Sequence, residues 1–233
     1  MTASPPLEKP APLRIGLPLA ILASAGIAYL IPFDAGFDRL TMGSPALRFV
    51  AMIGVWTAGL WLQRRNGFIL PVHGLRWPVS TIILICAGVA AWCAAMDAVV
   101  FKAVVPASYV AFENQPLALR LFYYCTRAFN ENALHRLFLG GLFAWLLRLA
   151  LPQRKLAFPL ALLGMSAAHL VNVVLNAGPM VDLTPVTAAW MFCRFFLPGA
   201  FWGWLYVRHG FVANETAAIG VHLVLQPMMS AAF

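Results

Sequence analysis

The chain has 233 residues, of which 62% are hydrophobic and 10% are charged, and it carries a net charge of +8. Soluble domains carry about 25% charged residues, so this composition excludes a water-soluble enzyme, a disordered protein and a secreted disulfide scaffold. The basic residues are scattered between apolar runs, which argues against a nucleic-acid-binding face. The sequence therefore predicts an all-α membrane protein, a polytopic bundle of transmembrane helices embedded in the lipid bilayer.

The first 14 residues are polar and rich in proline, and they predict a short disordered tail. The apolar run that follows resembles a secretory signal peptide in length. Pro32, Phe33 and Asp34 come directly after it, where a signal peptide would have small residues for cleavage. We therefore expect this run to be retained as the first membrane span.

Seven apolar runs approach the roughly 20 residues that a helix needs to cross a bilayer. Six or eight spans remain alternatives, because the first run is short and the segment 102–118 is partly apolar. We expect two parts after the tail: residues 15–119 with three spans, and a core of residues 120–230 with four. The seven runs cover residues 15–32, 46–62, 79–100, 120–148, 156–177, 186–207 and 213–230.

The basic residues predict the orientation, because cytoplasmic loops carry an excess of lysine and arginine. With the N-terminus in the cytoplasm, the opposite side receives Asp34, Asp38, Glu113 and Asp182. The excess of arginine over lysine and the abundant alanine favour a bacterial inner membrane. The cytoplasmic side then holds Lys9, Arg14, Arg64, Arg65, Arg76, Arg148, Arg154, Lys155 and Arg208.

Ionisable residues inside a span are costly and mark function by default. Asp97 lies near the end of the third span, where we expect a cap or an ion pair. Arg194 lies deeper in the sixth span, and we expect it to pair with an acid or to extend toward the interface.

The fourth span carries the heaviest polar load of the chain. Arg127, Glu131 and His135 recur every four residues and are expected to share one helical face. A structural ion pair between Arg127 and Glu131 is one explanation. The total desolvation cost favours a catalytic site instead. The other polar residues of this span are Asn130, Asn132 and Arg136.

Two further spans place histidines at a similar predicted depth. His169 and Asn172 lie in the fifth span, and His222 and Gln226 lie four residues apart in the seventh. A single buried histidine is more often a packed core residue than a functional one. Because Glu131, His169 and His222 all fall near mid-membrane, we expect their side chains to meet in one pocket with Gln226 at its rim.

One carboxylate and two imidazoles support two chemistries. They can bind a metal ion, or the carboxylate can act as a general base on water while histidine and amide groups stabilise an oxyanion. The sequence lacks both the His-Glu-x-x-His signature of metalloproteases and the Gly-x-Ser-x-Gly motif of serine hydrolases.

Residues 120–230 resemble the CAAX protease and bacteriocin-processing family of intramembrane endopeptidases, which includes the Ras-converting CAAX prenyl protease. The family's Glu-Glu-x-x-x-Arg motif corresponds to Glu131, Asn132 and Arg136. Its Phe-x-x-x-His motif corresponds to Met165 and His169. Its final His-x-x-x-Asn/Asp motif corresponds to His222 and Gln226. The run from residue 199 to residue 210 is also similar.

This resemblance implies a protease that needs neither a metal nor another cofactor and hydrolyses a membrane-embedded or lipid-linked peptide. Glu131 and His169 would activate water, and His222 with Gln226 would stabilise the oxyanion. Arg136 would orient the site, supported by Asn132, Asn172 and His135.

The sequence departs from the family at Asn132, where the motif has a second glutamate, and at Gln226, whose arm is longer than that of asparagine. A non-catalytic immunity protein, scaffold or assembly subunit of the same fold is therefore the alternative. A proton-relaying transporter is a third reading, but the sequence shows neither an inverted repeat nor paired broken helices.

Overall fold

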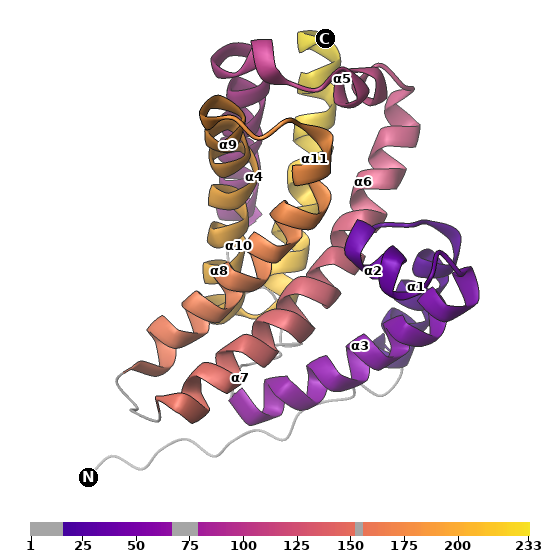
Figure 1. Ribbon diagram of the computed structural model, residues 1–233, viewed down its shortest axis with the longest axis vertical. Helices are drawn as coiled ribbons and strands as arrows, with labels where there is room; N and C mark the ends of the chain where they lie inside the picture. The colour runs from indigo at the N-terminus through magenta and orange to yellow at the C-terminus, as the bar shows by residue number, and fades with distance from the viewer. Residues whose placement is uncertain (1–15, 67–78, 152–155) are drawn as a thin grey trace.

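The computed structural model describes residues 16–66, 79–151 and 156–233, and within these ranges every regular element is a helix (Figure 1). The predicted tail at residues 1–14 lies outside the described residues, as do Arg76, Arg154 and Lys155. The prediction of an all-helical protein is confirmed for the described part of the chain.

The helices follow the apolar runs of the sequence closely. In the described part of the chain, three long helical segments contain a π-helical stretch. In one segment it follows an α-helix, and in the other two it lies between two α-helices. The three segments are α4 (Val79–Ala95) with η1 (Met96–Val100), α6 (Leu117–Asn132) with η3 (Ala133–Gly140) and α7 (Gly141–Ala150), and α9 (Pro185–Met191) with η6 (Phe192–Phe196) and α10 (Leu197–His209).

The other long helices are unbroken α-helices, and short helices connect them. The long ones are α1 (Gly16–Leu30), α3 (Pro45–Asn66), α8 (Ala157–Asn176) and α11 (Phe211–Ala232). The short ones are α2 (Ala35–Leu40), η2 (Lys102–Val104), α5 (Ala107–Glu113) and η5 (Gly178–Met180).

Four helical segments are long and apolar enough to cross a membrane, which fits a multi-pass membrane protein. Helix α1 has 15 residues, and its length of roughly 22 Å is less than the ~30 Å of a bilayer core. Segment α9–α10 and helix α11 are longer, but polar residues interrupt their apolar character. The four segments are Pro45–Asn66, Ser80–Val100, Leu117–Ala150 and Ala157–Met180.

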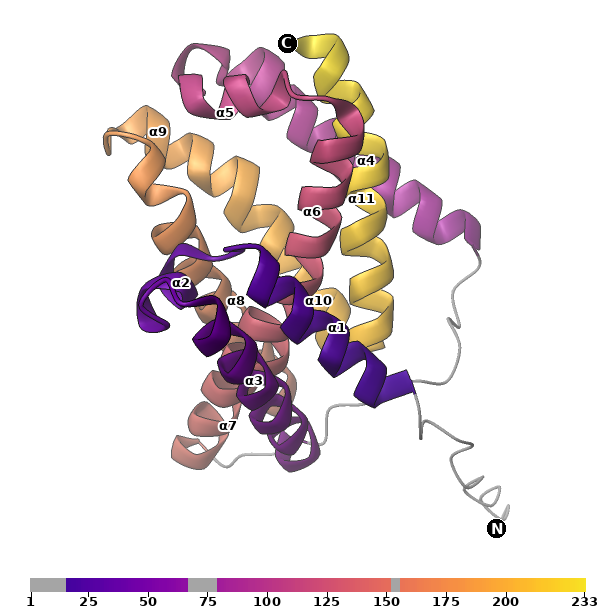
Figure 2. The ribbon, with the colours of Figure 1, turned by 90° about the vertical axis from the view of Figure 1, so that its right-hand side faces the viewer.

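The rod formed by α6, η3 and α7 runs through the middle of the molecule, and α8 lies alongside it (Figure 1). Helices α4 and α11 pack together on one side of this rod, whereas α1 and α3 pack together on the other (Figure 2). One apolar core forms around Trp56 and Leu137, between α3 and η3. A second forms around Leu205 and Val221, between α10 and α11.

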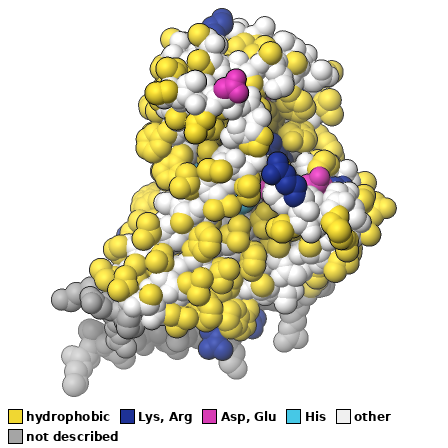
Figure 3. Space-filling view, viewed as in Figure 1, with side chains coloured by type: hydrophobic (Ala, Val, Ile, Leu, Met, Phe, Trp, Pro, Cys, Tyr) yellow, Lys and Arg dark blue, Asp and Glu magenta, His cyan; other side chains and the backbone are white. Residues whose placement is uncertain are grey.

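The outer surface is largely apolar on the face shown in Figure 3. Its charged side chains lie near the upper and lower ends and in the notch beside the lobe of α1–α3. This distribution suits helices whose outer faces contact lipid and whose ends reach the polar interfaces.

Each of the three π-helical segments carries a buried charged residue: Asp97 in η1, Arg136 in η3 and Arg194 in η6. Arg194 Nε donates to Asp97 Oδ2 over 2.6 Å. The predicted ion-pair role of both residues is confirmed. The indole of Trp190 and the hydroxyl of Tyr109 also donate to Asp97, over 2.9 and 3.1 Å. The pair therefore joins η1 to η6 through charge-assisted hydrogen bonds.

Candidate active site

A cavity of about 420 Å³ lies among α4, α5, α6, α8, α10 and α11. Glu131, His169 and His222 all line it, so the three residues that the sequence singled out share one space. Its walls also include Cys93 and Tyr109, so residues 15–119 contribute to it as well as the predicted core. The other polar lining residues are Ser108, Tyr123, Tyr124, Arg127, Asn132, Arg136, Asn172, Asn176 and Arg194.

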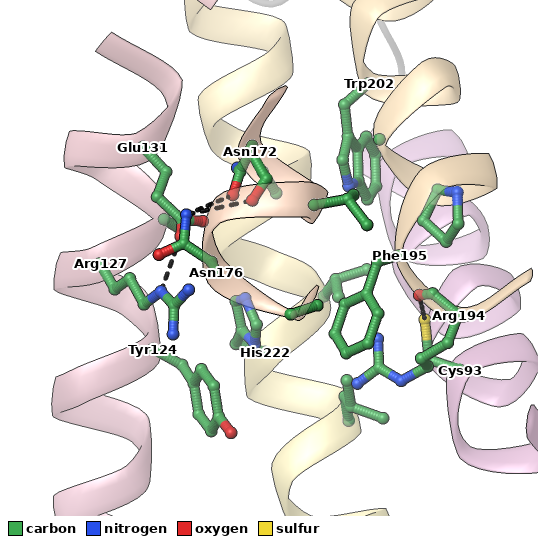
Figure 4. Close-up of a pocket in the computed structure, with 18 of the residues that line it drawn as sticks. Cys93, Tyr124, Arg127, Glu131, Asn172, Asn176, Arg194, Phe195, Trp202 and His222 are labelled. Carbon is green, nitrogen blue, oxygen red and sulfur yellow. Dashed lines mark hydrogen bonds and ion pairs between the residues drawn. The ribbon is translucent and has the colours of Figure 1, made fainter. Parts of the chain in front are cut away.

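Glu131 lies on α6 in the wall of the cavity, and its carboxylate points toward Arg127 of the same helix (Figure 4). Arg127 Nε donates to Glu131 Oε1 over 2.7 Å. The two side chains remain 26% and 20% exposed. The ion pair that the sequence offered as a structural alternative therefore exists, and it leaves the carboxylate accessible from the cavity.

His169 lies on α8 and contacts the carbonyl oxygen of Phe195 through Nε2 over 3.0 Å. Because a carbonyl oxygen only accepts, this bond requires the proton on Nε2 and leaves the lone pair on Nδ1. Nδ1 is buried, and it has no hydrogen-bond partner within the described residues. A Cβ atom on Gly199 would overlap the imidazole, so this glycine gives the ring the space it occupies.

His222 lies on α11 with its imidazole stacked on the ring of Tyr124. The ring centroids are 5.1 Å apart and the planes differ by 6°. The Nδ1 atom of His222 is buried and makes no hydrogen bond to any described residue.

Arg136 and Asn132 form the end of the cavity where η3 begins. The guanidinium of Arg136 donates to Asn132 Oδ1 and to the carbonyl oxygen of Gly199. On α8, Asn176 Nδ2 donates to Asn172 Oδ1 over 2.9 Å, so the amide protons of Asn172 are left for another partner.

Gln226 does not line the cavity among the described residues, contrary to the predicted place at its rim. Its Oε1 atom accepts a hydrogen bond from Arg120 over 3.3 Å. Gln226 lies four residues after His222 on a regular helix, but its longer side chain reaches the ion pair of Arg120 and Glu113.

His135 also faces away from the cavity. Its Nε2 atom lies 2.9 Å from Asp34 Oδ2 in the turn after α1. The expectation that residue 135 shares a face with residues 127 and 131 assumed an α-helical repeat throughout. The π-helical segment from Ala133 adds a residue to the turn, so Arg136 faces the cavity in place of His135.

Asp34 connects His135 to the wall of the cavity. It accepts from Asn176 Nδ2 over 2.6 Å and caps α2 through the amide of Phe37. Burial opposes ionisation of Asp34, but the hydrogen bond and charge of His135 hold its pKa at about 2. His135 therefore supports the site from behind, through Asn176.

The sequence reasoning missed Tyr124, Asn176 and the pair Asn214–Glu215 of α11. Within the described residues, the side-chain oxygens of Glu215 and both polar atoms of Asn214 are buried without a hydrogen bond. Glu215 precedes His222 by seven residues, which is two helical turns. This spacing places both residues on the same face of α11, and it could have drawn attention to Glu215.

The described residues contain no group of three or more histidine, cysteine, aspartate or glutamate side chains arranged to hold a metal ion. Comparison of the chain with models of known protein families, with curated proteins and with solved structures found no match. The cavity itself brings together a carboxylate, two imidazoles and side-chain amide groups around one space.

Gly199→Ala should displace the imidazole of His169 and break its hydrogen bond to Phe195, because the new methyl group occupies the position of the ring. The NMR signal of His169, in protein labelled with ¹³C-histidine, should shift. Gly88→Ala on α4 is the control, since open space surrounds that position. An unchanged His169 signal in Gly199→Ala would contradict this geometry.

Proposed function

We propose that this chain is an intramembrane endopeptidase that hydrolyses a peptide bond of a membrane-embedded or lipid-linked substrate. The observation that supports the proposal most strongly is that Glu131, His169 and His222 line a single cavity between apolar helices. The carboxylate and the two histidines come from three different helices and make no hydrogen bond to one another in the described residues. Hydrolysis by an activated water would use all three.

In the proposed reaction, a water molecule in the cavity loses a proton to the carboxylate of Glu131 as its oxygen attacks the carbonyl carbon of the peptide bond. His169 lines the same cavity, and we assign it to hold this water beside Glu131. Proton transfer needs heavy atoms about 2.6–3.2 Å apart, or one bridging water. The C–N bond of the tetrahedral intermediate then breaks, and the leaving amine takes the proton from Glu131.

The oxyanion of the intermediate needs hydrogen-bond donors. Gln226 is engaged elsewhere, so we assign the donors to His222 and to the amide of Asn172, both of which line the cavity. Arg136 adds positive charge at the same end and holds Asn132. The proposed mechanism uses no metal ion or other cofactor.

We also propose that the protein lies in a bacterial inner membrane with seven spans, its N-terminus in the cytoplasm and its C-terminus outside. The distribution of basic residues supports this orientation. The three segments beyond the four apolar ones are α1, α9–α10 and α11. Segment α9–α10 carries Arg194 into the bundle and helix α11 carries His222. These residues and their polar neighbours account for the lower hydropathy of the two segments.

Glu131→Gln should lower kcat/KM by a factor of about 10²–10⁴, because the amide cannot act as a base. The measurement uses the full chain in lipid nanodiscs and a library of internally quenched peptides that carry a palmitoyl chain. His169→Ala and His222→Ala should cause losses of similar order. Asp182→Asn, at an exposed acid outside the cavity, is the control and should retain full activity.

Strong chelators should leave the activity of the wild-type protein unchanged. Activity that is lost on chelation and restored by zinc would replace the glutamate mechanism with a metal site. Equal cleavage by wild type and Glu131→Gln, or no cleavage by either, would contradict the protease proposal and favour a non-catalytic scaffold or immunity protein.

A further inference from the structure

Different contacts orient Glu131, His169 and His222 in the cavity. An ion pair with Arg127 directs Glu131, and a hydrogen bond to Phe195 fixes the ring of His169. The imidazole of His222 makes no hydrogen bond within the described residues. Its defined contact is the parallel stack on Tyr124, at 5.1 Å between centroids. Whatever holds the plane of Tyr124 therefore also holds the plane of His222.

Tyr124 is itself fixed at two points. Its hydroxyl donates to Glu113 Oε1 over 2.8 Å. The ring of Phe112 packs edge-on against it, with centroids 5.5 Å apart and planes at 86°. Glu113 and Phe112 both belong to α5, so this short helix determines where the tyrosine ring of α6 lies.

The other oxygen of Glu113 pairs with Arg120 over 2.7 Å, and both side chains are almost fully buried. Removing either partner would leave an uncompensated charge in an apolar interior, so the two side chains are costly to separate. Arg120 also donates to Gln226 and to Ser230 on α11. The same guanidinium thus connects α5 and α6 to α11, one turn beyond His222.

We infer that Tyr124, held by Glu113 and Arg120, is a positioning residue that sets the orientation of the His222 imidazole in the cavity. The hydrogen bond from Arg120 also explains why Gln226 lies outside the cavity. Gln226 is part of the group of residues that holds Tyr124 and His222, and it is not part of the oxyanion site. The orientation of the ring is independent of any reaction, whereas its catalytic consequence rests on the proposed function.

The orientation is tested in the full chain in nanodiscs, labelled with ¹³C-histidine, with the His222 signal assigned through His222→Gln. The ring current of a stacked tyrosine shifts the imidazole protons upfield. Tyr124→Leu should abolish this shift, whereas Tyr124→Phe should retain it in large part because the ring remains. The signal of His135 is the internal control, since its partner is Asp34. An unchanged His222 signal in Tyr124→Leu would overturn the inference.

A second spectroscopic variant tests the anchor of Tyr124 with the tyrosine ring still present. Glu113→Gln removes the charge that pairs with Arg120 and weakens the anchor of the tyrosine hydroxyl while leaving its ring present. The His222 signal should broaden or move in this variant. A sharp, unshifted signal would mean that the tyrosine ring, and with it His222, is fixed by something other than Glu113.

The catalytic consequence is tested with a double-mutant cycle on the palmitoylated peptides. Tyr124→Leu should lower kcat by about 10–10²-fold, the scale expected for misplacing a catalytic group by about 1 Å, with KM little changed. In the His222→Ala background the same substitution should have no further effect, because it acts through His222. Tyr29→Leu, at an exposed tyrosine of α1, is the matched control.

Additive losses in the cycle would assign Tyr124 a role separate from His222 and overturn the inference. If the wild-type protein cleaves none of the peptides, the proposed protease function fails. The spectroscopic result still decides whether Tyr124 orients His222, so the two failures are distinguishable.

Discussion

A guanidinium or carboxylate group that leaves water for an apolar interior loses its hydration, and it is tolerated there only when a partner compensates for the loss. Five of the eight acidic residues of this chain meet a basic partner within the described residues. Four of these pairs join different elements. One of them, Asp38–Arg48, joins α2 to α3, and the other three connect elements around the cavity. These three pairs are Asp97–Arg194, Asp34–His135 and Glu113–Arg120.

These pairs surround the cavity. The Asp97–Arg194 pair fixes η1 against η6, and Asp34 with His135 and Asn176 fixes the turn after α1 against η3 and α8. The pair of Glu113 and Arg120 fixes α5 against α6. Because each pair is costly to separate, the walls of the cavity hold their relative positions without a hydrogen bond from one catalytic candidate to another.

The π-helical segments are the second element of this arrangement. A π turn accommodates one more residue than an α turn and changes which side chains face a neighbouring helix. At Ala133 this change brings Arg136 to the cavity together with Glu131 and Asn132, and it directs His135 to Asp34. Such turns are frequent at functional sites, and here each one carries a charged residue into the interior.

Much of the helical layout could be predicted from the sequence, because apolar runs set where helices begin and end. The run 213–230, for example, corresponds to α11 at Phe211–Ala232. The shared cavity of Glu131, His169 and His222 followed from their similar depth in three runs. The positions of His135 and Gln226 could not be predicted, because spacing rules assume an α-helical repeat and cannot see a partner such as Arg120 about a hundred residues away.

The central claim is that a polar, water-accessible cavity inside an apolar bundle joins Glu131, His169 and His222. Single cysteines at these three positions, in a chain whose native cysteines are replaced by alanine, can be labelled in nanodiscs with a charged methanethiosulfonate reagent. The matched controls are Leu170→Cys and Leu223→Cys, whose native side chains are 51% and 57% exposed on the outer faces of α8 and α11. The account predicts fast labelling at the three cavity positions and labelling at least tenfold slower at the two controls. Equal rates, or faster labelling at positions 170 and 223, would contradict it.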